Sequence, residues 1–333
     1  MKANKLTEQL QFKALLPLYQ YMLKSRLLEN RMVTLQRHGL LATYAGASGQ
    51  EALYVAIGYL LKKEDVHVPY YRDQPTMLMR GYKPIDLIRY WSGSEAGNTI
   101  PYKDLPICVP IATQCLHAAG VAYAQKFKQT EQITLVTLGD GATSKGDFYE
   151  AINFASLYEL PIVFVINDNG WAISTPLDKQ TKECDLTKKA YSVGMKHLTV
   201  DGTDMNECIA TLTNAIEFAR SNQPVLIHAK TVRLCDHTTA DDAKRYKSKI
   251  LINDEKQQDP IKKLKKTLVE FYNWQEKDDF ALINKIQKEL DKDIDTFKKD
   301  HVQTPETMFE HCYENMPESL KQQQSELNHD TTN

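Results

Sequence analysis

The sequence has no surplus of charge of either sign and no apolar run long enough to span a membrane. It contains 41 lysine and arginine residues against 43 aspartate and glutamate residues, which gives a formal net charge of −2. A chain so close to neutrality has no basic excess with which to hold a polyanion, so we expect no nucleic-acid partner. Apolar stretches such as residues 160–166 are far shorter than the roughly 20 residues of a transmembrane helix. We therefore expect no membrane partner.

The chain also lacks a cysteine pattern typical of disulfides or of a metal site. Its six cysteines are scattered, without a C-x-x-C pair and without a histidine at ligand spacing. Residues 1–11 include Glu8 and have no continuous apolar core, so they resemble neither a secretory signal nor a transit peptide. Free thiols and the absence of a targeting pattern together predict a cytoplasmic protein.

What the chain does contain is an ordinary globular composition, with 42% hydrophobic and 25% charged residues. A chain of 333 residues with this composition buries enough apolar surface to fold, which excludes disorder as its main state. Charged residues alternate with apolar ones at helical spacing over residues 10–37, and a Gly-containing stretch, residues 39–49, follows. A second helix is predicted over residues 51–61, and a loop rich in aromatic and charged residues over 62–80.

The middle of the chain alternates apolar, β-branched runs with helical patterns. Strands are predicted at residues 133–138, 161–166 and 225–232, and helices at 147–158 and 206–221. Strands that are apolar on both faces are typical of a parallel sheet covered by helices, so we expect an α/β fold. Helical periodicity returns at 261–272 and 280–297. We divide the chain into an N-terminal helical arm (1–45), an α/β core (46–245) and a C-terminal helical extension (246–333).

Two predicted strands end in oxygen-bearing side chains. Gly139, Asp140 and Gly141 follow the strand at 133–138, and Asn169 follows the strand at 161–166. A right-handed crossover makes such strands parallel, and their carboxyl ends then share one edge of the sheet. Carboxylate and amide oxygens are hard ligands suited to Mg²⁺, which takes further oxygens from phosphate and water. Glycines and the following helix N-terminus favour an anionic phosphate ligand at the same place.

Three other active-site classes lack their required residues. No G-x-x-x-x-G-K-[ST] motif is present, which excludes a P-loop nucleotidase. A phosphatase of the haloacid dehalogenase type needs a D-x-D strand before Asp140, and the sequence has none there. Gly46-Ala47-Ser48-Gly49 lacks the G-x-S-x-G spacing of a serine hydrolase and does not follow a convincing strand.

The Gly-Asp-Gly motif followed by Asn169 resembles the thiamine-diphosphate motif. Its setting, "GDGATSKGDFYEAINFASLYELPIVFVINDNGWAIST", is similar to the alpha subunit of the decarboxylating first component of 2-oxo acid dehydrogenase complexes. The resemblance extends to "LYQYMLKSRLLENRM", "ASGQEA", "PYYRDQP", "IATQCLHAAGVAYA", "DHTTADDAKRYKSK" and "FEHCYENMPESLKQQ", and so covers nearly the whole chain. It implies the transketolase-like thiamine-diphosphate-binding fold.

Carried over residue by residue, the resemblance implies two sets of ligands. The Mg²⁺ ligands would be Asp140, the side chain of Asn169 and the main-chain carbonyl of Trp171. The cofactor would be bound by a further set: Tyr71 and Arg72 on the diphosphate oxygens, Gly141 and Ala142 beside the diphosphate, Ile111 at the aminopyrimidine, and His237 near the diphosphate and the substrate carboxylate. A guanidinium meets phosphate through two donors, which suits Arg72 to its implied role.

The resemblance assigns catalysis to His237, as a proton donor or acceptor during acyl transfer. In animal relatives the loop after this histidine carries a phosphorylated serine, whereas this chain has Thr238 and Thr239, so phosphoregulation is left open. The chain also departs from many relatives at Asp168, where they have asparagine. That change removes no implied metal ligand.

The implied activity is the oxidative decarboxylation of a small 2-oxo acid, with transfer of the acyl group to a lipoyl-bearing acyltransferase. A beta subunit would supply the glutamate that activates the cofactor, in an α₂β₂ heterotetramer. Pyruvate is slightly favoured as substrate, while "ATQ" at residues 112–114 resembles branched-chain 2-oxo acid dehydrogenases, and an acetoin dehydrogenase is a further alternative. A non-catalytic interaction module with the same fold is the alternative of another class.

Overall fold

A five-stranded, fully parallel sheet forms the centre of the molecule, with strand order β1-β2-β3-β7-β6. The computed structural model describes residues 2–300, 308–310 and 312–330. The strands are β1 (Val66–Val68), β2 (Thr134–Gly139), β3 (Ile162–Asp168), β6 (Lys196–Asp201) and β7 (Val225–Lys230). Their parallel arrangement, with helices on both faces, confirms the predicted α/β fold class.

The strands at the centre of the sheet are apolar on both faces because each face packs against helices. Along β2 and β3, alternate residues go to two different apolar clusters: Leu135 and Val163 to one, and Val136 and Phe164 to the other. All four side chains are fully buried. This division explains why these strands show no alternation of apolar and polar residues in the sequence.

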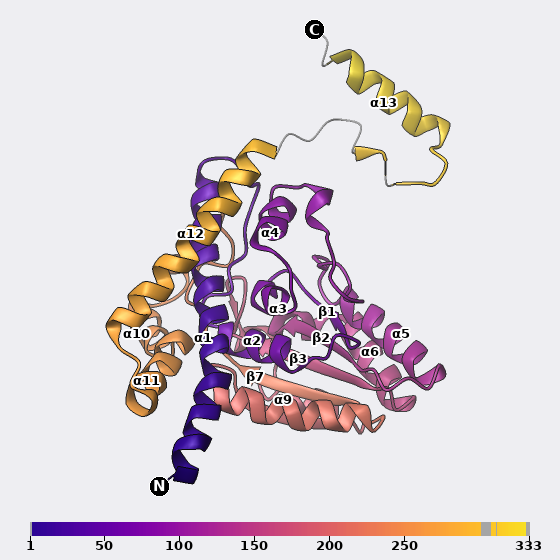
Figure 1. The fold of residues 1–333 in the computed structure, drawn as a ribbon. Helices are drawn as coiled ribbons and strands as arrows, with labels where there is room; N and C mark the ends of the chain where they lie inside the picture. The colour runs from indigo at the N-terminus through magenta and orange to yellow at the C-terminus, as the bar shows by residue number, and fades with distance from the viewer. Residues whose placement is uncertain (1, 301–307, 311, 331–333) are drawn as a thin grey trace.

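Helices from different parts of the chain cover the two faces. The first cluster includes residues of α2 (Glu51–Leu60) and α9 (Met205–Arg220), and the second includes residues of α5 (Thr113–Phe127) and α6 (Gly146–Leu157). Figure 1 shows α9 along one side of the sheet and α5 and α6 together on another. The predicted helices at 51–61, 147–158 and 206–221 correspond to α2, α6 and α9.

The N-terminal arm and the C-terminal extension lie together. Helix α1 (Lys2–Arg37) contacts α11 (Pro260–Tyr272) and α12 (Glu276–Asp300), and Figure 1 shows α12 running beside α1. Leu18, Leu264 and Leu290, one from each helix, belong to the same apolar cluster as α2 and α9. Helix α10 (Lys249–Gln257) precedes α11, while α13 (Glu318–Asp330) stands clear of the body (Figure 1).

The structure differs from the sequence prediction in residues 62–80 and at one edge of the sheet. The segment predicted as a loop contains strand β1 and helix α3 (Gln74–Met79), and α4 (Pro84–Trp91) follows it. Strand β6 was not predicted, because it has only one buried residue and its other positions are half-buried or exposed, with charged residues at both ends. The remaining elements are short: β4 (Trp171–Ala172), β5 (Thr175–Pro176), α7 (Leu177–Gln180), α8 (Thr187–Tyr191) and the 3₁₀ turns η1 (Glu95–Gly97), η2 (Asp140–Ser144) and η3 (Ala243–Arg245).

The cysteines and the helices relate to two expectations from the sequence, free thiols and the lack of a membrane span. The six cysteines are all free. Within the part of the chain that the structure describes, no helix combines the length and the apolar character of a membrane span.

Candidate functional site

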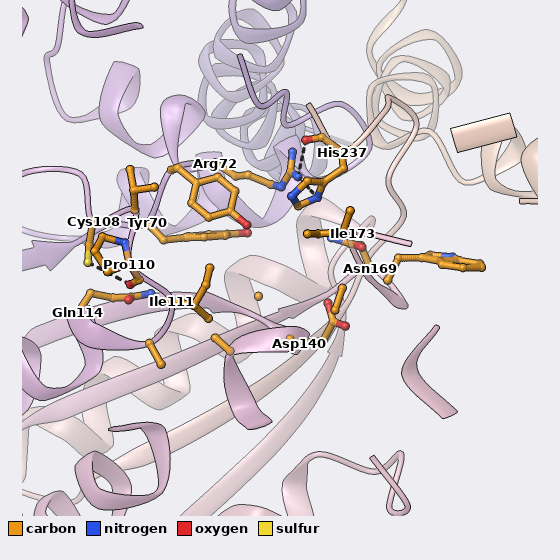
Figure 2. Close-up of a pocket in the computed structure, with 18 residues that line it drawn as sticks. Tyr70, Arg72, Cys108, Pro110, Ile111, Gln114, Asp140, Asn169, Ile173 and His237 are labelled. Carbon is orange, nitrogen blue, oxygen red and sulfur yellow. Dashed lines mark hydrogen bonds between the residues drawn. The ribbon is translucent and has the colours of Figure 1, made fainter. Parts of the chain in front are cut away.

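A cavity of about 220 Å³ opens at the carboxyl ends of β2 and β3. These strands are direct neighbours in the sheet, as the site prediction required. The structure brings every sequence-predicted site residue to this one cavity, and Figure 2 shows Arg72, Asp140, Asn169 and His237 around it. The predicted residues that line it are Tyr71, Arg72, Ile111, Asp140, Gly141, Ala142, Asn169, Trp171 and His237.

Asp140 is a buried carboxylate at the end of β2. It opens the 3₁₀ turn η2 and is 1% exposed. Gln180 donates a hydrogen bond from Nε2 to its Oδ2 at 3.3 Å. Burial, and then the negative charge of Asp168, raise the pKa of Asp140 to about 7. A carboxylate in this environment gains most from a bound cation, because a cation offsets both the lost hydration and the neighbouring negative charge.

Asn169 lies in the turn that follows β3. Its Oδ1 is buried and has no hydrogen-bond partner among the described residues. The lone pairs of this oxygen are therefore available to a ligand. Asp168 fixes the turn, because its Oδ1 accepts a hydrogen bond from the Gly170 backbone N–H at 2.8 Å. Gly170 has a φ of +79°, a conformation that glycine adopts without strain. Strand β4 begins directly afterwards, at Trp171.

The donor set therefore fits Mg²⁺ better than a transition metal. It offers one carboxylate and one amide oxygen, with main-chain carbonyls next to them, all of them hard oxygen ligands. Among the described residues there is no cluster of three or more histidine, cysteine or acidic side chains that could hold a metal on its own. An ion at Asp140 and Asn169 would have to take further ligands from the backbone, from water or from a bound phosphate.

Gly141 is required by a close approach of two chain segments. A Cβ added at this position would lie 2.9 Å from the Cβ of Ala172, closer than two carbons can pack. The next residue, Ala142, is 6% exposed and also lines the cavity. Small residues at 141 and 142 thus keep the η2 turn against β4 and leave the space above it open.

Arg72 brings a buried positive charge to the part of the cavity that faces Asp140 and Asn169. It is 2% exposed, and its Nη1 donates to the Gly46 carbonyl at 2.6 Å. Its Nη2 donates to the His237 carbonyl at 2.7 Å, and the guanidinium lies 5.4 Å from the centre of the Tyr71 ring. Arg72 also lines the cavity. A desolvated guanidinium there strongly favours an anionic ligand.

His237 is held by two arginines. Its Nδ1 lies 2.8 Å from Arg72 Nη2 and 3.3 Å from Arg233 Nη1. Guanidinium groups only donate, so Nδ1 is the acceptor and the ring hydrogen of the neutral imidazole is on Nε2. Burial and the two positive charges lower the pKa of His237 to about 3. Its backbone N–H donates to Asp241 Oδ2 at 2.8 Å, which anchors the loop.

The network around Arg233 extends this anchoring. Arg233 is 1% exposed, and its Nη2 donates to the Ile173 carbonyl at 2.9 Å and to the Tyr246 hydroxyl at 2.6 Å. The Tyr246 hydroxyl in turn donates to Asp241. No motif points to Arg233 or Tyr246, and only their closeness to His237 in the chain could have indicated them.

An apolar wall completes the cavity, and the sequence analysis did not predict two of its members. Cys108 and Ile173 line it together with Val109 and Ile111. Ala112, the N-cap of α5, has a φ of +68°, and Ile173 has a φ of +56°, which is rare for a β-branched residue. Backbone strain of this kind collects at functional sites, but no residue pattern reveals it in a sequence.

Comparison with known proteins identifies the family to which the chain belongs. The family model for the dehydrogenase E1 component matches residues 19–306. The chain is 36% identical over 332 residues to the pyruvate dehydrogenase E1 component subunit alpha of Acholeplasma laidlawii, covering 97% of this chain and 95% of the relative. It is 40% identical over 263 residues to the 3-methyl-2-oxobutanoate dehydrogenase subunit alpha of Mycobacterium tuberculosis, covering 78% and 72%. A pyruvate dehydrogenase alpha subunit of Staphylococcus aureus is 35% identical, covering 93% and 85%.

Proposed function

Because this chain belongs to the dehydrogenase E1 component family, we propose that it holds Mg²⁺ and thiamine diphosphate in the cavity at the ends of β2 and β3 and serves the decarboxylation of a 2-oxo acid. The family consists of thiamine-diphosphate-dependent 2-oxo acid dehydrogenases, and the relatives are their alpha subunits. The observation that carries the proposal is the meeting of Asp140 and Asn169 with Arg72 and His237 around one cavity.

The residues of the site divide into two groups with separate tasks. Asp140, the Oδ1 of Asn169 and the carbonyl of Trp171 would hold Mg²⁺, since Asp140 is a buried carboxylate and the buried Oδ1 of Asn169 has no hydrogen-bond partner among the described residues. Arg72 and Tyr71 would bind the diphosphate oxygens, with Gly141 and Ala142 providing room beside them. Ile111 would support the aminopyrimidine from the apolar wall. When bound, thiamine diphosphate supplies the electron sink that decarboxylation needs.

His237 is the group of this chain best placed to donate a hydrogen bond to the substrate. Its Nδ1 is occupied by Arg72 and Arg233, which leaves Nε2 as the atom that carries the exchangeable hydrogen. The imidazole is held neutral, so its Nε2–H can donate a hydrogen bond to a substrate oxygen without a change of charge. We propose this role for His237 in substrate binding and in the transfer of the acyl group.

A beta subunit is implied by the family, and we propose an α₂β₂ assembly that passes the acyl group to a lipoyl-bearing acyltransferase. The exposure of the cavity rim supports a covering partner. Val109, Ile111 and Ile173 remain 53%, 44% and 55% exposed although all three are apolar and line the site. A partner that covered this rim would exclude water from the cavity and strengthen its electrostatic interactions.

Pyruvate is the substrate we favour. Relatives named as pyruvate dehydrogenase subunits match over 97% and 93% of this chain, whereas the relative named as a 3-methyl-2-oxobutanoate dehydrogenase subunit matches over 78%. The higher identity of the latter relative, 40%, makes a branched-chain 2-oxo acid the second candidate.

The test is to co-express the chain with its beta subunit and to measure cofactor binding and turnover. Wild type should bind thiamine diphosphate only in the presence of Mg²⁺ and should reduce an artificial electron acceptor faster with pyruvate than with 3-methyl-2-oxobutanoate or acetoin. Asp140→Ala removes the buried carboxylate and should abolish Mg²⁺-dependent binding.

Asp147→Ala is the matched control, because Asp147 is an acidic residue in the first turn of α6 that does not line the cavity. Cofactor affinity that is unchanged in Asp140→Ala would refute the proposed metal site. Faster turnover of 3-methyl-2-oxobutanoate would instead move the assignment to the branched-chain class.

A further inference from the structure

A histidine and an aspartate form a buried pair behind the turn that carries Asn169. His228 lies on β7 and is 1% exposed, and Asp168 is the last residue of β3 and is 7% exposed. The Nε2 of His228 is 2.8 Å from Oδ2 of Asp168. Neither side chain is among those that line the cavity. The pair is therefore close to the proposed metal site without being open to it.

Asp168 is tied to its surroundings at three points. Its Oδ1 accepts from the Gly170 N–H at 2.8 Å, and its carbonyl accepts from the Thr231 N–H, also at 2.8 Å. The third point is the contact of Oδ2 with His228. One oxygen thus fixes the turn that presents Asn169, and the other is held from the neighbouring strand.

The direction of the hydrogen bond between His228 and Asp168 follows from chemistry. An ionised carboxylate accepts hydrogen bonds and cannot donate them, so the ring hydrogen is on Nε2 and His228 is the donor. The other ring nitrogen, Nδ1, is buried and has no hydrogen-bond partner in the described chain. The closest acidic oxygen to it, Oδ1 of Asp185, is 3.8 Å away and already accepts from the Thr187 hydroxyl at 2.6 Å. The hydrogen bonding of His228 is directed at Asp168.

We propose that His228 is a positioning residue for the metal end of the cofactor site: by donating to Oδ2 of Asp168, it keeps Oδ1 on the Gly170 N–H and so holds Asn169 and Trp171 in place for the ion. This inference rests on the proposed Mg²⁺ and thiamine diphosphate site. Without the donor, the Asp168 carboxylate has no partner on one oxygen and is free to rotate out of the turn. Replacing a residue that does not touch the metal but orients its ligands typically weakens metal affinity by roughly 10–100-fold.

The test compares side chains at position 228 that differ in whether a donor reaches Asp168. The amide nitrogen of glutamine can take the place of Nε2, whereas asparagine is one methylene too short and methionine has the length but no donor. The complex of the chain with its beta subunit is titrated with Mn²⁺ at saturating thiamine diphosphate, and free Mn²⁺ is measured by electron paramagnetic resonance. His197→Asn, an exposed histidine on the adjacent strand β6, is the matched control.

We expect the Mn²⁺ dissociation constant to rise tenfold or more in His228→Asn and His228→Met, and to stay within threefold of wild type in His228→Gln and His197→Asn. The melting temperature of the cofactor-free complex is measured in parallel. A merely structural histidine would lower that temperature and leave Mn²⁺ affinity unchanged, and this result in either donor-free variant would overturn the inference while the proposed function stands. If wild type itself binds no Mn²⁺ with thiamine diphosphate, the proposed function fails.

Discussion

At the scale of single residues, the site is organised by charges that are buried and already in contact with one another. Arg72 and Arg233 both direct guanidinium groups at the Nδ1 of His237. Each arginine is also tied to a main-chain carbonyl, that of Gly46 for Arg72 and that of Ile173 for Arg233. The positive charges are therefore fixed before any ligand arrives, which lowers the cost of ordering the site on binding.

The depressed pKa of His237 has a consequence for stability. Its value in the folded chain, about 3, is below the ordinary value of 6.5. As the pH falls below 6.5, His237 takes up a proton in the unfolded chain but stays neutral in the folded chain. The free energy of unfolding therefore decreases between pH 6.5 and pH 3. The contribution is at most about 1.4 kcal/mol per pH unit, reduced by solvent screening.

The measurement is urea unfolding of wild type and His237→Gln at pH 7.5, 6.5 and 5.5. The difference in unfolding free energy between the two should shift in favour of the variant as the pH falls. The exposed His38→Gln serves as control and should show no such trend. A constant difference between wild type and His237→Gln over this range would contradict the burial of a neutral imidazole.

The principal site residues were predictable at this scale because they follow recognisable strand ends. Asp140 and Asn169 each follow an apolar run within three residues, and the parallel pairing of the two strands brings them to the same edge of the sheet. Cys108 and Ile173 could not be predicted, because their place in the wall depends on backbone paths outside any strand or helix with a periodic pattern. His228 is also part of an apolar strand, and only its cross-strand neighbours reveal what it contacts.

At the scale of elements, helix α9 illustrates a boundary set by one side chain. Oδ1 of Asp204 accepts from the backbone N–H groups of Asn206 and Glu207 at 2.8 and 3.0 Å. Asp204→Ala removes this N-cap and should lower the unfolding free energy by about 1 kcal/mol. The measurement is equilibrium unfolding in urea.

Lys145→Ala provides a comparison at another helix start. Lys145 is the N-cap residue of α6, and its side chain makes no capping hydrogen bond. Its replacement should change the unfolding free energy by less than about 0.5 kcal/mol. Equal losses in the two variants would show that the cap of α9 contributes nothing specific.

Elements with a clear period were predictable from the sequence, and those without one were not. The central strands β2, β3 and β7 and the helices α6 and α9 all coincide with predicted segments. Strand β1 has only three residues, and α3 has a proline in its first turn and follows two tyrosines and charged residues, so the segment reads as a loop. Strand β6 carries Lys196 and His197 at an edge of the sheet, where one side remains open to solvent.

At the scale of the whole molecule, helices α11 and α12 of the C-terminal extension contribute to the central core. Leu290 of α12 is 0% exposed and belongs to the apolar cluster that includes residues of α1, α2 and α9. Leu290→Ala should therefore lower the unfolding free energy by about 2–5 kcal/mol, although it is distant in sequence from the sheet. Phe280, on the same helix, is 67% exposed, and Phe280→Ala should cost far less.

Thermal and urea unfolding of the two variants measure this difference. A small loss in Leu290→Ala would contradict the contribution of α12 to the core. Because Leu18, Leu264 and Leu290 belong to one apolar cluster, we propose that α1, α11 and α12 fold as one unit with the core.

The strand order also determines how long a strand edge stays unpaired while the chain is being synthesised on the ribosome. Strand β3 pairs on one side with β2, made just before it, and on the other with β7, which is synthesised only after α9. Until then one edge of a strand that is fully buried in the finished fold has no partner, and unpaired strand edges promote aggregation. Nascent chains should consequently be most vulnerable between the emergence of residues 168 and 225, and in that interval a holding chaperone would benefit this protein most.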